Sequence, residues 1–159
     1  MDIDRIRAAA ARIGRHVTRT PLLSSPGIDA LAGRRVLVKA ECLQVTGSFK
    51  ARGAFAAVSA LDPATRTRGV LAYSSGNHAQ GIALAARTFG VPAVIVMPAD
   101  APGAKLDGTR ALGAEGVLYA DAQGLTRIAP HSVAAVDATG AGDAFDGAFL
   151  AEILAGADG

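Results

Sequence analysis

Tryptophan is absent from this sequence, and cysteine occurs once among the 159 residues, as Cys42. A single cysteine cannot form an internal disulfide, and without a second cysteine nearby it also argues against a thiolate metal site. The sequence therefore fits a reducing compartment, and we expect no metal site.

Long apolar runs are missing as well. No stretch approaches the roughly 18 apolar residues that a membrane-spanning helix requires. The N-terminal residues MDIDRIRAAAARIGRHV carry acids among their arginines, unlike a signal or transit peptide. We therefore expect no membrane association and a cytoplasmic location.

Positive charge is concentrated in the first part of the chain. Residues 1–116 hold 15 Lys or Arg against 8 Asp or Glu, whereas residues 117–159 hold 1 against 6. The arginines are scattered, and there is no tryptophan to stack on nucleic-acid bases. We expect no nucleic-acid partner, and the change of charge indicates two parts of different character.

The pattern of apolar residues predicts an α/β fold. With 50% hydrophobic and 19% charged residues, the composition is that of one folded domain. An amphipathic helix is predicted over residues 2–15, with Ile3, Ile6, Ala10 and Ile13 on one face. Strands are predicted at 36–40, 69–73, 92–97, 117–120, 125–128 and 133–136, and further helices at 48–60, 77–89, 102–112 and 142–154. This alternation predicts a mostly parallel sheet with helices on both faces, in three layers.

A lysine stands at the start of one predicted helix. In the stretch KAECLQVTGSFKARGA, Lys50 follows a Thr-Gly-Ser turn. The positive end of a helix dipole disfavours the charged ammonium group, which helps to free the amine for attack on an aldehyde. The alternative is an ordinary surface lysine.

A second loop joins a predicted strand to a predicted helix, with the sequence SSGNHAQ from Ser74. Backbone amides at the start of a helix can point at a carboxylate or a phosphate, and Asn77 offers both a donor and an acceptor to a ring hydroxyl. The alternative is helix capping alone, which Ser and Asn favour whatever the function.

Together with Thr20-Pro21-Leu22, SSGNHAQGIALAA and MPADAPGAK, these stretches resemble the fold-type-II pyridoxal-phosphate family of threonine and serine dehydratases and serine racemases. The resemblance runs from about Asp4 to Glu115. It implies that Lys50 forms the Schiff base with pyridoxal 5'-phosphate, that Phe49 flanks the cofactor ring, and that Asn77 sits beside the ring hydroxyl. The loop that holds the substrate carboxylate corresponds to Ser75, Gly76, Asn77 and His78.

The remaining residues, 116–159, resemble the C-terminal region of ribokinase-like sugar kinases through the motif DATGAGDAFDGAF. That resemblance implies an anion hole made by Gly140, Ala141 and Gly142, with Asp143 as the catalytic base and with ATP and magnesium as cofactors. We therefore predict a dehydratase-like segment over 1–115 and a kinase-like segment over 116–159. The two form a chimera of two α/β fragments within one structural unit.

The longer resemblance implies an ammonia-lyase that acts on a small amino-acid substrate such as threonine or serine. We find no tetraglycine-type loop for the cofactor phosphate, so weak or absent activity is predicted. A carbohydrate-kinase fragment and a non-catalytic chimeric fragment are the two alternatives. Enzymes of this family are usually homo-oligomers, so the resemblance implies that a homo-oligomer is one possible assembly of this chain.

Overall fold

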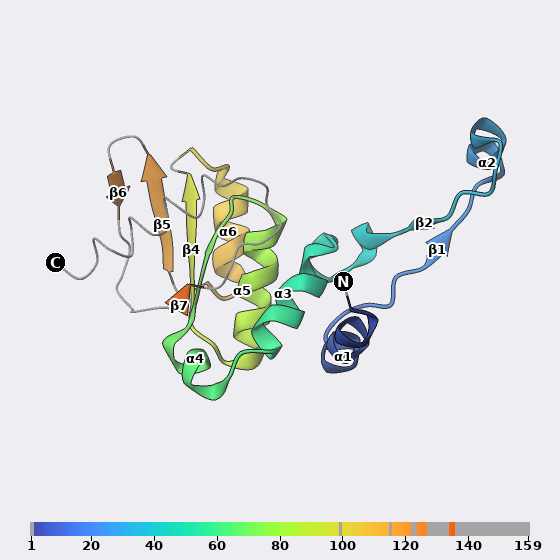
Figure 1. Cartoon of the computed structure of the whole chain (residues 1–159). Helices are drawn as coiled ribbons and strands as arrows, with labels where there is room; N and C mark the ends of the chain where they lie inside the picture. The colour runs from blue at the N-terminus through green and yellow to red at the C-terminus, as the bar shows by residue number, and fades with distance from the viewer. Residues whose placement is uncertain (1, 99, 115, 122–123, 127–133, 136–159) are drawn as a thin grey trace.

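The computed structural model describes residues 2–98, 100–114, 116–121, 124–126 and 134–135, and a five-stranded sheet forms one side of it (Figure 1). The strand order is β6-β5-β4-β3-β7. The strands are β3 (Val70–Tyr73), β4 (Ala93–Pro98), β5 (Gly116–Asp121), β6 (Gly124–Thr126) and β7 (Ala134–Ala135). Every pairing is parallel except that of β6 with β5, which confirms a mostly parallel α/β sheet.

Two described helices pack on the sheet, α5 (Asn77–Phe89) and α6 (Gly103–Ala111). Both belong to the cluster that contains the alternate strand residues Val70, Ala72, Ala93, Ile95 and Met97, so they cover the same face. The intervening residues Leu71, Val94 and Val96 form a second buried cluster. The prediction of helices on both faces is therefore not met by the described residues, although the alternation of side chains gives the sheet two apolar faces.

A third helix, α3 (Lys50–Ser59), packs against α5 through small side chains. Ala51 and Ala54 of α3 are fully buried or nearly so. A Cβ atom built on Gly81 of α5 would lie 3.3 Å from the Ala54 Cβ and 3.4 Å from the carbonyl carbon of Lys50. The two helix backbones therefore approach closely at the first residue of α3, because α5 has no side chain there.

The predicted N-terminal helix is confirmed as α1 (Ile3–Ile13), where the Asp2 carboxylate accepts a hydrogen bond of 2.9 Å from the Asp4 amide. Its end is held by a ring cluster that follows Ile13. The His16 ring stacks on Phe55 of α3 at 5.4 Å and meets Phe89 of α5 edge-on at 5.0 Å. A short helix, α4 (Pro63–Arg68), connects α3 to β3 and begins at the Asp62 cap.

Residues 22–39 form an arm that projects away from the sheet (Figure 1). It consists of β1 (Leu22–Leu23), α2 (Pro26–Ala32) and β2 (Val38–Lys39), and among the described strands these two pair only with each other, antiparallel. The strand predicted at 36–40 is thus present in part but was wrongly assigned to the parallel sheet, because local sequence does not reveal a strand's partner.

The sheet contains strands from both sides of the predicted boundary between residues 115 and 116, since Val94 of β4 pairs with Gly116 of β5. The predicted helix 142–154 lies outside the described residues. Among the helices that are described, none has both the length and the apolar character needed to cross a membrane.

Candidate active site

Lys50 is the first residue of α3, and its side chain is half-buried. Two short 3-10 turns precede it, η1 (Glu41–Leu43) and η2 (Val45–Gly47). The Lys50 Nζ lies 5.1 Å from the centre of the Phe49 ring, which is itself 60% exposed. The amine is therefore placed at a helix start beside the open face of an aromatic ring, where a planar ligand could stack.

The turn before Lys50 has unusual backbone geometry and unsatisfied polar groups. Thr46 has a φ of 63°, a left-handed conformation that is uncommon outside glycine. The hydroxyls of Thr46 and Ser48 are buried without a hydrogen-bond partner in the part of the chain described. Leaving such a group unpaired costs about 1–3 kcal/mol. Two orphaned hydroxyls within four residues of Lys50 fit a ligand that carries several hydrogen-bonding atoms.

The second predicted loop lies where β3 ends and α5 begins. Gly76 occupies the cap position of this 13-residue helix, and no side chain caps the first turn. The Gly76 amide itself donates to the Ser74 hydroxyl at 3.2 Å. Ser75 and Asn77 are exposed. An uncapped helix start at the carboxyl end of a parallel strand suits a carboxylate or a phosphate.

The structure brings these two loops together. His78 of α5 is partly buried, and its pKa is lowered, first by burial and second by the positive charge of Lys50. Gly81, one turn further along α5, lies so near α3 that a Cβ atom built on it would be 3.4 Å from the Lys50 backbone. Phe49, Lys50 and His78 therefore share one neighbourhood. The kinase-like residues predicted from sequence, Gly140, Ala141, Gly142 and Asp143, lie outside the described residues.

We call the irregular segment from η1 to Lys50 the lysine turn. A group of polar residues beside it was not identified from the sequence. The Arg52 guanidinium binds both carboxylate oxygens of Glu41, at 2.8 Å from Nε and 2.7 Å from Nη2. The Thr20 hydroxyl donates to the same carboxylate at 2.5 Å. These hydrogen bonds lower the pKa of Glu41 to about 2, and the bonds from Arg52 have the larger effect. Spacing gave no signal for the pair, because Glu41 and Arg52 are 11 residues apart and an irregular turn separates them.

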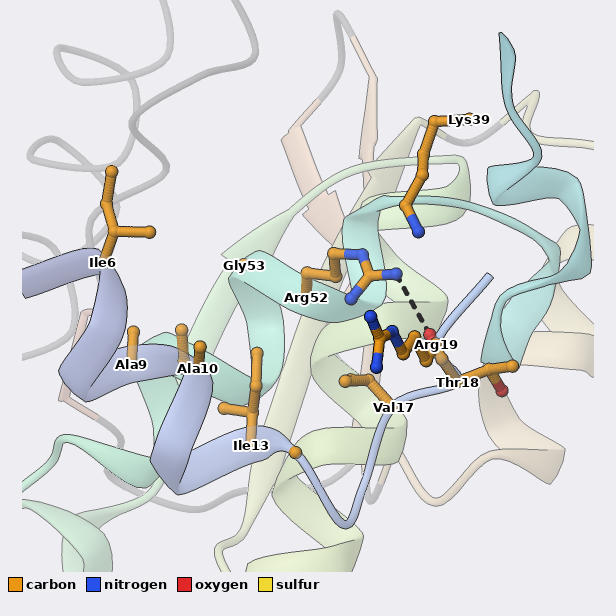
Figure 2. Close-up of a pocket in the computed structure, with 12 residues that line it drawn as sticks. Ile6, Ala9, Ala10, Ile13, Val17, Thr18, Arg19, Lys39, Arg52 and Gly53 are labelled. Atoms are coloured by element: carbon orange, nitrogen blue, oxygen red, sulfur yellow. Dashed lines mark hydrogen bonds between the residues drawn. The ribbon is translucent and has the colours of Figure 1, made fainter. Parts of the chain in front are cut away.

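Arg52 also lines a pocket of about 650 Å³ between α1 and α3 (Figure 2). Figure 2 shows apolar side chains of α1, among them Ile6 and Ile13, on one side, with Arg52, Arg19 and Lys39 at the other end. Neither Lys50 nor any residue of the Ser74–Gln80 loop lines this pocket. In the described residues, no group of three or more His, Cys, Asp or Glu side chains could hold a metal ion.

The fold and the site together define a class: an α/β protein that presents a lysine amine next to an uncapped helix start. The family model described as "Pyridoxal-phosphate dependent enzyme" matches residues 13–149. The chain belongs to this family, whose cofactor is pyridoxal 5'-phosphate. The match includes most of the segment that the sequence analysis assigned to a sugar kinase, so neither the kinase fragment nor the chimera is supported.

Individual relatives agree with the family. The chain is 57% identical over 111 residues to an L-threo-3-hydroxyaspartate ammonia-lyase of Pseudomonas sp, covering 70% of this chain and 35% of that protein. It is 47% identical over 116 residues to an L-threonine ammonia-lyase of Thermotoga maritima, covering 73% of this chain and 29% of the relative. The solved structure of maize serine racemase matches with a TM-score of 0.71 and 44% identity, covering 77% of this chain and 38% of that one. The chain thus spans about a third of the length of these relatives.

Proposed function

We propose that Lys50 and the loop from Ser75 to His78 form the cofactor-binding and substrate-binding part of a pyridoxal-phosphate-dependent ammonia-lyase for small hydroxy-amino acids. One observation carries this proposal: a half-buried lysine amine begins α3 beside the uncapped start of α5. The names of the relatives, which include ammonia-lyases for threonine and for hydroxyaspartate, support the substrate class.

Each residue has a separate role in this proposal. Pyridoxal phosphate, when bound, supplies an aldehyde that reacts with amines and a ring that withdraws electrons from the substrate. The Lys50 Nζ binds the cofactor and later takes the proton from Cα of the substrate. The Phe49 ring shields one side of the site from water. The Asn77 amide orients the cofactor ring by hydrogen bonding to the hydroxyl of that ring. The amides of the loop from Ser75 to His78 hold the substrate carboxylate.

We expect the 159-residue chain by itself to capture the cofactor but to show little turnover. The sequence contains no tetraglycine-type loop for the cofactor phosphate, and orientation of the reacting groups supplies much of a catalyst's advantage. A threonine deamination rate near the ordinary enzyme value of about 10 per second would contradict this expectation.

The experiment that tests the proposal uses the three lysines of the chain, Lys39, Lys50 and Lys105. Purified protein is mixed with pyridoxal phosphate, the change in visible absorption is recorded, and borohydride then fixes the adduct for peptide mass mapping. We expect the label on the Lys50 peptide and its loss in Lys50→Ala, whereas Lys105→Ala retains it. Equal labelling of all three lysines would overturn the proposal.

The sugar-kinase alternative does not enter this proposal. Its residues Gly140, Ala141, Gly142 and Asp143 lie outside the described residues, and nothing in the described structure favours ATP or magnesium binding. The cytoplasmic location, the homo-oligomeric assembly and the boundary between segments 1–115 and 116–159 stay predictions.

A further inference from the structure

The Glu41–Arg52 pair, which we call the clamp, closes a ring of the chain around the lysine turn. Glu41 opens η1, and Arg52 lies in the first turn of α3, so Lys50 and both 3-10 turns stand between the two charged residues. The guanidinium and the carboxylate meet through two parallel hydrogen bonds. This fork-to-fork geometry fixes orientation as well as distance, which a single bond from a lysine cannot do.

A second set of contacts ties the clamp to the segment before the arm. Arg52 Nη2 donates to the carbonyl of Thr18 at 3.0 Å, and the Thr20 hydroxyl donates to Glu41 at 2.5 Å. The Gln44 side chain, 4% exposed, accepts from the Thr18 amide at 2.7 Å and donates to the Thr18 carbonyl at 2.8 Å. The start of the lysine turn, its middle and the first turn of α3 are thus all attached to residues 18–20.

Partial burial distinguishes the clamp from an ordinary surface ion pair. The side chains of Arg52 and Glu41 are 33% and 18% exposed, whereas those of the α1 pair Arg7 and Asp4 are 73% and 80% exposed. Exposed pairs contribute little to stability and are screened by salt. Bidentate pairs that are shielded from water are stronger and more directional. The Asp4–Arg7 pair therefore serves as a matched control.

The turn that the clamp encloses needs such support. Thr46 has its positive φ there, and Thr46 and Ser48 have unpaired hydroxyls in the described part of the chain. A conformation of this kind persists only when the surrounding structure holds it in place. On α3 itself, no side chain caps the first turn, which begins at Phe49 and Lys50. The contacts of the helix start alone do not account for the placement of the lysine.

We propose that the Glu41–Arg52 clamp positions Lys50 for attack on the cofactor aldehyde, and that the Thr20 hydroxyl keeps the Glu41 carboxylate oriented toward Arg52. This inference rests on the proposed role of Lys50. Glu41 and Arg52 act as positioning residues, because they touch Lys50 through the backbone of the turn and of α3 rather than through the reacting atoms. The clamp therefore controls the rate of covalent capture, while the loop from Ser75 to His78 contributes to initial binding.

The test is the rate of covalent capture as a function of pyridoxal phosphate concentration. We expect Glu41→Gln and Arg52→Gln to lower the limiting rate about tenfold, because small misplacements of a nucleophile are costly. The half-saturating concentration of pyridoxal phosphate stays within about twofold of the wild-type value, since initial binding depends on the loop from Ser75 to His78. Arg52→Lys, which retains the charge without the fork, recovers part of the rate. Asp4→Asn and Arg7→Gln leave both parameters unchanged.

Melting curves of each variant establish that it is folded at the assay temperature. If Arg52→Gln is not, Thr20→Val carries the test, because it removes the hydroxyl that donates to Glu41 and accepts from Arg52 while both charged residues stay in place, with an expected loss of about threefold in the limiting rate. An unchanged limiting rate in folded Glu41→Gln overturns the clamp. So does a loss that appears entirely in the half-saturating concentration.

A measurement without the cofactor distinguishes failure of this inference from failure of the proposed function. Reductive methylation with formaldehyde measures the reactivity of Lys50 against Lys105 of α6 in the same sample. If the wild type fails to capture pyridoxal phosphate, the proposed function fails. The clamp then stands if Glu41→Gln changes the ratio of Lys50 to Lys105 methylation, and it falls if the ratio is the same as in the wild type.

Discussion

The α3–α5 pair buries its apolar side chains, whereas the arm leaves its apolar side chains exposed. On α3, Phe55 is 2% exposed, and on α5, Ala79 is fully buried. On the arm, Leu22 is 61% exposed and Leu31 92%. Both regions are rich in apolar residues, but only burial converts this composition into stability. The comparison teaches that the buried apolar surface beneath the candidate site comes from helix packing and that the arm adds nothing comparable within the described structure.

The sharpest way to test this comparison is to empty the core under α3. Phe55→Ala removes a ring that contacts both His16 and Phe89, so we expect the free energy of unfolding to fall by about 3–5 kcal/mol. Urea denaturation measures this loss. Phe49→Ala, which removes an equal ring that is 60% exposed, is the control and should change stability by less than about 0.5 kcal/mol. Similar losses in both variants would contradict the contrast.

The close approach of the two helices gives a second, smaller effect. Gly81→Val places a branched side chain against Ala54 and the Lys50 backbone, and overpacking of this kind costs about 1–3 kcal/mol. Gly53→Val, on the same helix as Lys50, meets no atom within 4 Å of the new Cβ and should be close to neutral. A tolerated valine at position 81, measured by thermal unfolding, would show that the helices can separate at little cost.

The clamp predicts a dependence on pH. The folded-state pKa of Glu41 lies near 2, below the ordinary 4.5, so the ionised carboxylate stabilises the fold above pH 4.5. That contribution is lost as the pH falls from 4.5 toward 2. Glu41→Gln is therefore less stable than the wild type at neutral pH, and the two unfolding curves converge below pH 2. A difference in stability that is constant from pH 7 to pH 2 would contradict the ion pair.

The smallest effect is expected on the arm. Leu31→Ser removes an apolar side chain that is 92% exposed, so the free energy of unfolding should change by less than about 0.5 kcal/mol. Chemical denaturation alongside Phe55→Ala provides the comparison. A loss above 2 kcal/mol would mean that the arm packs against protein in solution.

Local signals predicted the sheet and its helices well. The helix predicted at residues 77–89 has those bounds as α5, because a Ser-Ser-Gly turn precedes it and Gly90 ends it with a φ of 64°. The short helices α2 and α4 were not predicted, although Asp62 and Pro63 carry an ordinary start signal for α4. Their length of 7 and 6 residues leaves too little periodicity to detect.

The candidate site was predictable only as two separate loops. Lys50 and Asn77 each stand at the start of a helix, and spacing along the chain identifies both positions. Their proximity depends on Gly81, and the Glu41–Arg52 bonds depend on a turn in which Thr46 takes a positive φ. Neither feature follows a helical or strand period, so sequence patterns could not indicate the clamp.

The glycine contact between α3 and α5 has a consequence for how such a site can diversify. Because a Cβ atom at Gly81 would already lie 3.4 Å from the Lys50 backbone, a larger side chain there would push the two helices apart, and widening their spacing would leave a void. We expect sequence changes around the candidate site to arise in the loops that precede the helices, while the helix pair is passed on as a unit. An engineer who transplants the lysine turn into another scaffold would have to carry α5 along with it.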